Sequence, residues 1–89
     1  MVQDFKFGLE QNYPNPFDGS TRIEFVIPSS GQVRFFVNDV VGRQVYESTS
    51  LYSGGRNTIS FNKGNLSSGV YYYGIEYNGQ RRLRKMILK

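Results

Sequence analysis

Short runs in which apolar and polar residues alternate, each ended by a turn signal, constrain this chain more than any other feature. Residues 23–27 and 33–37 both place an apolar side chain at every second position, which is the period of a strand with one buried face. Similar runs follow at residues 59–61 and 70–77. Asn78-Gly79 is the strongest two-residue hairpin signal of the chain. The pattern predicts antiparallel strands joined by short turns.

The composition agrees with a β fold, because the chain has seven Phe, seven Tyr and ten Gly but no alanine. Turn signals recur about every 8–12 residues, a spacing typical of two packed sheets. We therefore predict an all-β protein, an immunoglobulin-like β-sandwich of about seven antiparallel strands. Residues 1–89 are expected to form a single domain, with an irregular Pro/Asn-rich segment at 1–21 and the sandwich strands at 22–89. A short edge strand is expected at Phe5–Leu9.

The segment Asn12-Tyr13-Pro14-Asn15-Pro16-Phe17 contains two X-Pro bonds. Each proline favours an extended residue before it and removes a backbone donor, so the segment cannot be a central strand. Tyr13 and Phe17 are expected to pin it onto the sheet.

Two local patterns predict specific geometry. Asp39-Val40-Val41-Gly42 reads as a type I turn with Gly42 in the left-handed conformation, and the Asp39 carboxylate can accept nearby amides. Tyr71, at the start of a late strand and five residues after Leu66, resembles a tyrosine corner, in which the hydroxyl bonds to upstream backbone. The alternative is a tyrosine that only fills the core.

The last five residues, Lys85-Met86-Ile87-Leu88-Lys89, are three apolar residues between two lysines. Two of the apolar side chains are expected to face the core. A last strand can also lie at a sheet edge with free backbone groups, which a partner strand can pair with. We take these five residues as the candidate recognition site. The alternative is an ordinary final strand with solubilising charges.

Four motifs in order resemble the type A C-terminal sorting domain of the Bacteroidetes type IX (Por) secretion system, from about Leu9 to Lys89. The first and last are specific together, whereas Asp-x-x-Gly alone is common in hairpins. The motifs are Leu9-Glu10-Gln11-Asn12-Tyr13-Pro14-Asn15-Pro16-Phe17, Asp39-Val40-Val41-Gly42-Arg43-Gln44-Val45, Leu66-Ser67-Ser68-Gly69-Val70-Tyr71-Tyr72-Tyr73 and Lys85-Met86-Ile87-Leu88-Lys89.

The resemblance implies a secretion signal carried by a folded domain at the end of a larger exported protein. It implies an N-terminal cargo, recognition by the type IX outer-membrane translocon, and removal by a sortase-like cysteine peptidase. The implied route is transit through the periplasm, then the cell surface or the medium. Met1 is then expected to be a start placed on a domain cut from a longer chain. The motif residues outside the last five are expected to be structural.

Catalysis finds no support in the sequence. There is no histidine and no cysteine, so the commonest general base, the thiolate nucleophile and disulfides are absent. The acids show no paired spacing; they are Asp4, Glu10, Asp18, Glu24, Asp39, Glu47 and Glu76. Asp18-Gly19-Ser20 near Asn12 and Asn15 offers one carboxylate for calcium and is better read as a turn. We expect no enzyme activity, no metal and no cofactor.

Other binding roles rest on weaker patterns. The basic residues Arg81, Arg82, Arg84 and Lys85 resemble a nucleic-acid patch, but alternation places them on two faces, so no nucleic acid is expected. A carbohydrate-binding or spacer module is the alternative function. Its candidate stacking rings are Phe36, Tyr46, Tyr52 and Tyr72. A weak homodimer through an edge strand is compatible with the sorting role.

Overall fold

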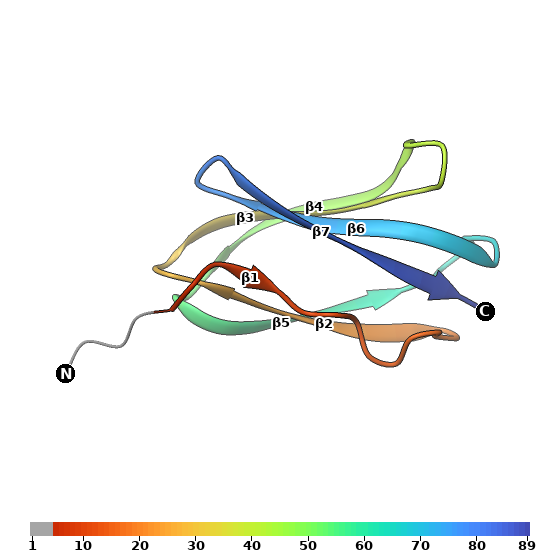
Figure 1. The fold of residues 1–89 in the computed structure, drawn as a ribbon, viewed down its shortest axis with the longest axis horizontal. Helices are drawn as coiled ribbons and strands as arrows, with labels where there is room; N and C mark the ends of the chain where they lie inside the picture. The colour runs from red at the N-terminus through yellow and green to blue at the C-terminus, as the bar shows by residue number, and fades with distance from the viewer. Residues whose placement is uncertain (1–4) are drawn as a thin grey trace.

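The computed structural model describes residues 5–89, so the expectation about Met1 lies outside it. The described residues form two antiparallel sheets and no helix, which confirms the predicted all-β sandwich (Figure 1). The strands are β1 (Gly8–Leu9), β2 (Ser20–Ile27), β3 (Gly31–Asn38), β4 (Gln44–Tyr52), β5 (Gly55–Asn62), β6 (Gly69–Tyr77) and β7 (Gln80–Leu88). Residues 5–89 hold no helix with the length and hydropathy needed to cross a membrane.

The strand order is β1-β2-β5 in one sheet and β4-β3-β6-β7 in the other. This is the immunoglobulin plan with the fourth strand moved onto the second sheet, where it pairs with β3. The chain crosses between the layers after β2, after β4 and after β5. As a result β7, the last strand, lies at the edge of the four-stranded sheet next to β1 of the other layer (Figure 1).

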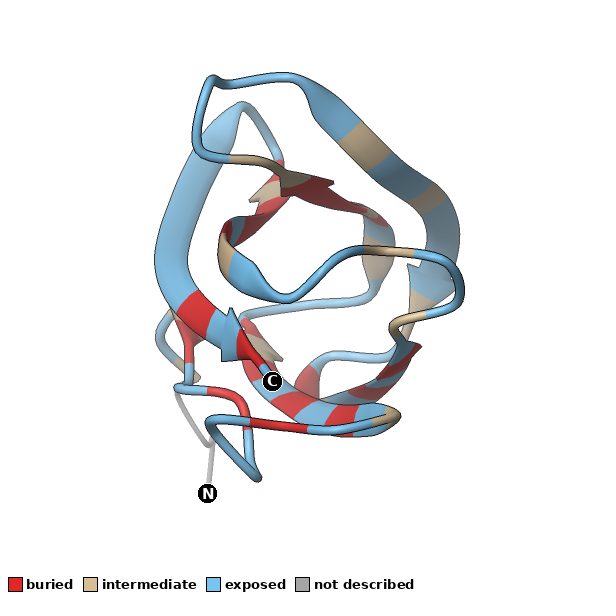
Figure 2. Cartoon of the chain, turned by 90° about the vertical axis from the view of Figure 1, so that its right-hand side faces the viewer, coloured by how far each residue is buried: buried red, intermediate tan, exposed pale blue. Residues whose placement is uncertain are grey.

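The core lies between the sheets and is built from the inward positions of β2, β3, β5, β6 and β7, while β4 adds only partly buried side chains. The alternation predicted for β2, β3 and β6 is confirmed, and along β2 Figure 2 shows it as alternating red and pale blue bands. Aromatic rings meet edge to face across the layers, as Phe35 and Phe61 do at a centroid distance of 6.0 Å. The fully buried side chains include Phe17, Ile23, Phe25, Ile27, Val33, Phe35, Val37, Tyr73, Ile75, Met86 and Leu88.

The first strand is shorter than expected, since β1 covers Gly8–Leu9 rather than Phe5–Leu9. Side-chain contacts hold the preceding residues instead of ladder hydrogen bonds. Phe7 stacks on Tyr77 with ring centroids 5.7 Å apart, and the guanidinium of Arg82 lies 4.6 Å from the Phe7 ring centre. Phe7 is therefore packed against the core although its segment does not extend the sheet.

Candidate functional site

The four sequence motifs gather at one end of the sandwich. Figure 1 places the C-terminus, the β3–β4 turn, the β5–β6 connection and the loop before β2 at the same end. Phe5, the first described residue, packs at the other end against Gly55, which pairs with Ile27. Motifs spread over the whole chain therefore meet in space, and we take this end as the candidate site.

The last strand divides its side chains between core and solvent. Met86 and Leu88 are 0% and 2% exposed, whereas Ile87 between them is 38% exposed. Lys85 and Lys89 are exposed as well, and Figure 2 shows the banding beside the C-terminus. The prediction that two of the three apolar residues face the core is confirmed. The surface of this motif thus consists of Lys85, Ile87 and Lys89.

The expected free edge of this strand is not free at the terminal motif. Residues 10–19, which we call the N-terminal arm, run along it. The Phe17 amide donates to Ile87 O (3.0 Å), and the Lys89 amide donates to Phe17 O (2.9 Å). The Ile87 amide donates to Asn15 Oδ1 (2.9 Å), and Gln11 Nε2 donates to Lys85 O (2.7 Å). The prediction of open backbone groups was wrong here because the arm satisfies them.

Tyr73 of β6 anchors the backbone of the arm. Its buried hydroxyl donates to Glu10 O and accepts from the Asn12 amide, both at 2.8 Å. The buried Asn12 side chain donates to Thr21 Oγ1 (3.0 Å) and to Pro14 O (3.1 Å). Buried polar groups are costly unless paired, and every one of these has a partner. The hydrogen bonds of the motif residues Asn12, Pro14 and Tyr73 therefore fix the position of the arm on the sandwich.

The two aromatic residues of the arm differ in role. Phe17 is 1% exposed and packs edge to face with Phe61, so its pinning role is confirmed. Tyr13 is 70% exposed, and pinning by its ring was a wrong prediction. Its backbone alone is tied to the sheet, through reciprocal 2.8 Å hydrogen bonds with Arg22. The bonds Tyr13-Pro14 and Asn15-Pro16 are both cis.

Burial gives Tyr73 a measurable pH signature. Desolvation raises the pKa of its phenol from 10.0 to about 12, although the Asn12 amide opposes the shift. The folded protein thus favours the neutral phenol. Burial of the neutral phenol contributes fully to the free energy of unfolding below pH 10. This contribution, about 3 kcal/mol, is lost as the pH rises toward 12.

We expect urea denaturation to show a falling free energy of unfolding across this window. Tyr73→Phe, which has no proton to lose, is expected to be less stable at neutral pH but to lose less between pH 10 and pH 12. Equal losses for the two proteins would contradict the assignment.

The second and third motifs form two loops at the same end of the sandwich as the arm. The Asp39 carboxylate accepts from the Val41 and Arg43 amides (3.1 and 2.9 Å) and pairs with Arg43 Nε (3.0 Å), while Gly42 has φ 88°. Partial desolvation opposes ionisation of Asp39, but the Arg43 and Val41 hydrogen bonds outweigh it and lower its pKa. The predicted turn, with Gly42 in the left-handed conformation, is confirmed.

The tyrosine corner also forms. Tyr71 is 7% exposed, and its hydroxyl donates to Ser67 O at 2.7 Å, which fixes the loop between Leu66 and β6. Leu66 is half-buried against the core, and Gly69 opens β6. Side chains of both motifs thus make the hydrogen bonds of these two loops.

The rings considered for sugar stacking are mostly engaged elsewhere. Phe36 is only 2% exposed, and the guanidinium groups of Arg34 and Arg81 lie 4.7 and 5.2 Å from its ring centre. Tyr46 packs on Phe35 and Phe61, and Tyr52 packs on Phe25. Of the four candidates, Tyr72 alone leaves a ring free of such packing, at 42% exposure. The four rings do not form a platform.

The basic residues of the last strand lie on two faces, and the candidate calcium site has no cluster of acids within the described part of the chain. Arg82 and Arg84 lie on the same face of β7 as Met86, where Arg84 Nε donates to Leu9 O at 2.7 Å. Arg81 and Lys85 lie on the other face, as the alternation predicted. Asp18 pairs with Lys63 at 3.4 Å, and residues 5–89 hold no group of three or more side chains suited to a metal.

Two features were missed by sequence reasoning. The first is the pairing of the arm with β7, for which Gln11 and Asn15 supply side-chain contacts. The second is the burial of Phe36 on the outer face, where the signal was present: Phe35-Phe36 breaks the alternation and requires apolar surroundings on both faces of β3.

The family comparison gives a match to the model of the secretion system C-terminal sorting domain over residues 11–89. Two structures of a β-glucosidase from Listeria innocua, one of them with glucose, share the fold with a TM-score of 0.53 each, at 11% and 12% identity. The match covers 96% of this chain but 16% of the β-glucosidase chain, so it concerns a small part of that enzyme. Such identity shows the fold alone.

Curated proteins gave no match by sequence. The family match includes all four motifs, apart from Leu9 and Glu10 at the start of the first motif. It confirms the resemblance that was drawn from these motifs. The chain belongs to the family of secretion system C-terminal sorting domains and carries the C-terminal sorting signal of type IX secretion.

Proposed function

We propose that the type IX outer-membrane translocon recognises this domain in its folded form, at the surface of the terminal motif. A C-terminal sorting domain implies an N-terminal cargo and the type IX machinery, and it directs export toward the cell surface or the medium. The proposal adds the residues that are contacted. Lys85, Ile87 and Lys89 make the contact, and Met86 and Leu88 act indirectly by holding the strand in place.

The observation that supports this proposal is the alternation along the last strand, together with the arm that holds it. The arm occupies the outer edge of Lys85–Lys89 by four hydrogen bonds, so a partner strand has no free edge there. Recognition then falls to the side chains that point to solvent. A flexible peptide signal has no need of this support, whereas a surface read in a fixed geometry does.

The remaining steps are proposed with it. The cargo and the domain pass through the periplasm as one chain, in which the sorting domain is a single folded unit. A sortase-like cysteine peptidase removes the domain after transport. The domain itself is proposed to be non-catalytic. A weak homodimer through the β7 edge, if formed, is restricted to the part beyond the arm, near Leu83.

The test is a fusion of residues 1–89 to the C-terminus of a periplasm-targeted fluorescent protein in a type IX-competent bacterium. We expect surface or extracellular fluorescence that is lost in a translocon-null strain. The double variant Lys85→Ala/Lys89→Ala is expected to stay folded and remain in the periplasm. The matched control Lys6→Ala/Arg56→Ala removes two exposed charges elsewhere and should be exported. Export of both double variants would refute the assignment of the contact residues.

A further inference from the structure

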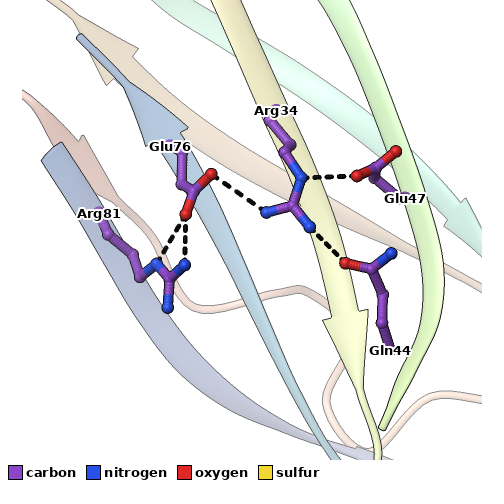
Figure 3. Close-up of polar contacts among 5 residues, drawn as sticks. All are labelled: Arg34, Gln44, Glu47, Glu76 and Arg81. Atoms are coloured by element: carbon purple, nitrogen blue, oxygen red, sulfur yellow. Dashed lines mark hydrogen bonds and ion pairs between the residues drawn. The ribbon is translucent and has the colours of Figure 1, made fainter. Parts of the chain in front are cut away.

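The outer face of the four-stranded sheet carries a second apolar cluster that is separate from the core. Phe36 is 2% exposed although it points away from the other sheet and lies outside the core cluster. The side chains of Arg34 and Arg81 cover its ring, and Figure 3 shows these two arginines joined through Glu76. One face of a sandwich sheet is ordinarily polar. This sheet is therefore apolar in part on both faces.

Gly74 makes this cluster possible. A Cβ at this position would lie 2.6 Å from Phe36 Cζ and 2.7 Å from Leu83 Cδ2. Because real Cβ atoms do not approach so closely, the missing side chain lets Phe36 and Leu83 pack over β6 from either side. The apolar surface of β3 thus continues across β6 to the last strand.

From this point the apolar surface becomes exposed and follows the last two strands. Tyr72 is 42%, Leu83 is 55% and Ile87 is 38% exposed. The register pairs Gly74 with Leu83, Tyr72 with Lys85 and Val70 with Ile87, so these side chains are neighbours on one face. We call this surface the outer strip; it consists of Val70, Tyr72, Leu83, Lys85 and Ile87.

The charges around the outer strip favour an acidic partner. The acids of this face are already engaged: Glu47 with Arg34, and Glu76 with Arg34 and Arg81 (Figure 3). The Arg81 interaction lowers the pKa of Glu76 most strongly, so it is ionised and paired. Lys85, in the middle of the strip, has no ion pair among residues 5–89. A carboxylate from a partner would complement it.

We propose that the outer strip is a docking surface for a protein of the sorting machinery that presents apolar side chains beside carboxylates. The inference rests on the proposed function and extends it, since it adds Val70, Tyr72 and Leu83 to the contact. The apolar groups supply the contact area, and Lys85 supplies the charge pair that orients it. Exposed apolar groups that lie together on a surface are typical of such sites.

Leu51 provides a matched control. It is an exposed leucine, at 76%, on the outer face of the same sheet, but it lies on β4 at the opposite edge. Its cross-strand neighbour is Gln32, so it is not part of an apolar surface. Leu83→Ser and Leu51→Ser therefore make the same chemical change in two different settings.

The experiment measures binding of the cargo fusion to outer membranes from translocon-positive and translocon-null cells. We expect Leu83→Ser and Tyr72→Ser each to weaken translocon-dependent binding by about tenfold, as for central interface residues. Leu51→Ser should bind as the wild type does. Circular dichroism checks that all three variants stay folded. If Leu83→Ser exposes Phe36 and disturbs the fold, the binding of Tyr72→Ser tests the inference instead.

Four outcomes overturn the inference, and the last of them overturns the proposed function too. Wild-type binding by all three variants, with export still lost in Lys85→Ala/Lys89→Ala, removes the outer strip but leaves the proposed function. Equal binding to translocon-null membranes assigns the surface to lipid. Self-association that is lost in Tyr72→Ser assigns it to a second copy of the chain. If wild-type export itself does not need the translocon, the proposed function fails as well.

Discussion

Replacing Met86 by aspartate is expected to unfold this domain, whereas the same substitution at Ile87 leaves it folded. Met86 is 0% exposed and Ile87 is 38% exposed, although they are adjacent on one strand. Aspartate at position 86 removes a core side chain and buries a carboxylate with no partner, at a cost of about 5 kcal/mol or more. A domain of 89 residues lies toward the low end of the usual total stability of about 5–15 kcal/mol, so this change takes up most of it.

Near-UV circular dichroism and urea denaturation of the two variants test this expectation. Met86→Asp should show no cooperative transition, and Ile87→Asp should unfold within about 0.5 kcal/mol of the wild type, as surface changes do. Two folded variants, or two unfolded ones, would contradict the placement of the last strand. The pair also separates stability from export, because Ile87→Asp is expected to fold and to be exported poorly.

Truncating Phe17 to alanine is expected to cost about 3–5 kcal/mol, the usual range for a buried phenylalanine. The ring is 1% exposed and packs on Phe61, and the backbone of the same residue holds the last strand. At about 4 °C per kcal/mol for a domain of this size, the midpoint of thermal unfolding should fall by at least about 12 °C.

Tyr13→Ala is the matched control for Phe17→Ala. Both residues are aromatic and lie in the same motif, but Tyr13 is 70% exposed, so its loss should shift the midpoint by about 3 °C or less. Thermal unfolding followed by circular dichroism measures both. A large shift for Tyr13→Ala together with a small one for Phe17→Ala would mean that the arm packs through the other face.

Sequence periodicity predicted most of the sandwich because its strands have one buried face. The rows at residues 23–27, 33–37 and 71–77 are all buried as expected, and the turn at Asp39–Gly42 has the predicted hydrogen bonds. These are local properties: alternation and turn chemistry act over a few residues. They need no knowledge of the rest of the chain.

The arm could not be predicted in the same way. Two of its hydrogen bonds to the last strand use the side chains of Gln11 and Asn15, and they join residues separated by 74 and 72 positions. No periodic pattern marks such a contact. Tyr13 was misplaced for a related reason, since an aromatic side chain in an irregular segment has no strand face to determine its direction.

The sequence predicted the alternation of the terminal motif but not its surroundings. Two of the three apolar side chains lie inside as expected, and the structure identifies them as Met86 and Leu88. The covered edge, however, changes which groups a partner can reach. Phe36 was taken for a surface ring because it lies on the outward face of β3. The gap left at Gly74 and the two arginine side chains bury it, and both depend on neighbouring strands.

The long separation between the arm and the last strand means that the surface of the terminal motif reports on the completeness of the whole domain. The Ile87 amide meets Asn15 only after the strands between them have paired, because those strands bring the two segments together. A chain that stopped early during synthesis, or one that remained unfolded, would not present Lys85, Ile87 and Lys89 in this arrangement. A machinery that reads them in the folded form would thereby also reject unfinished cargo.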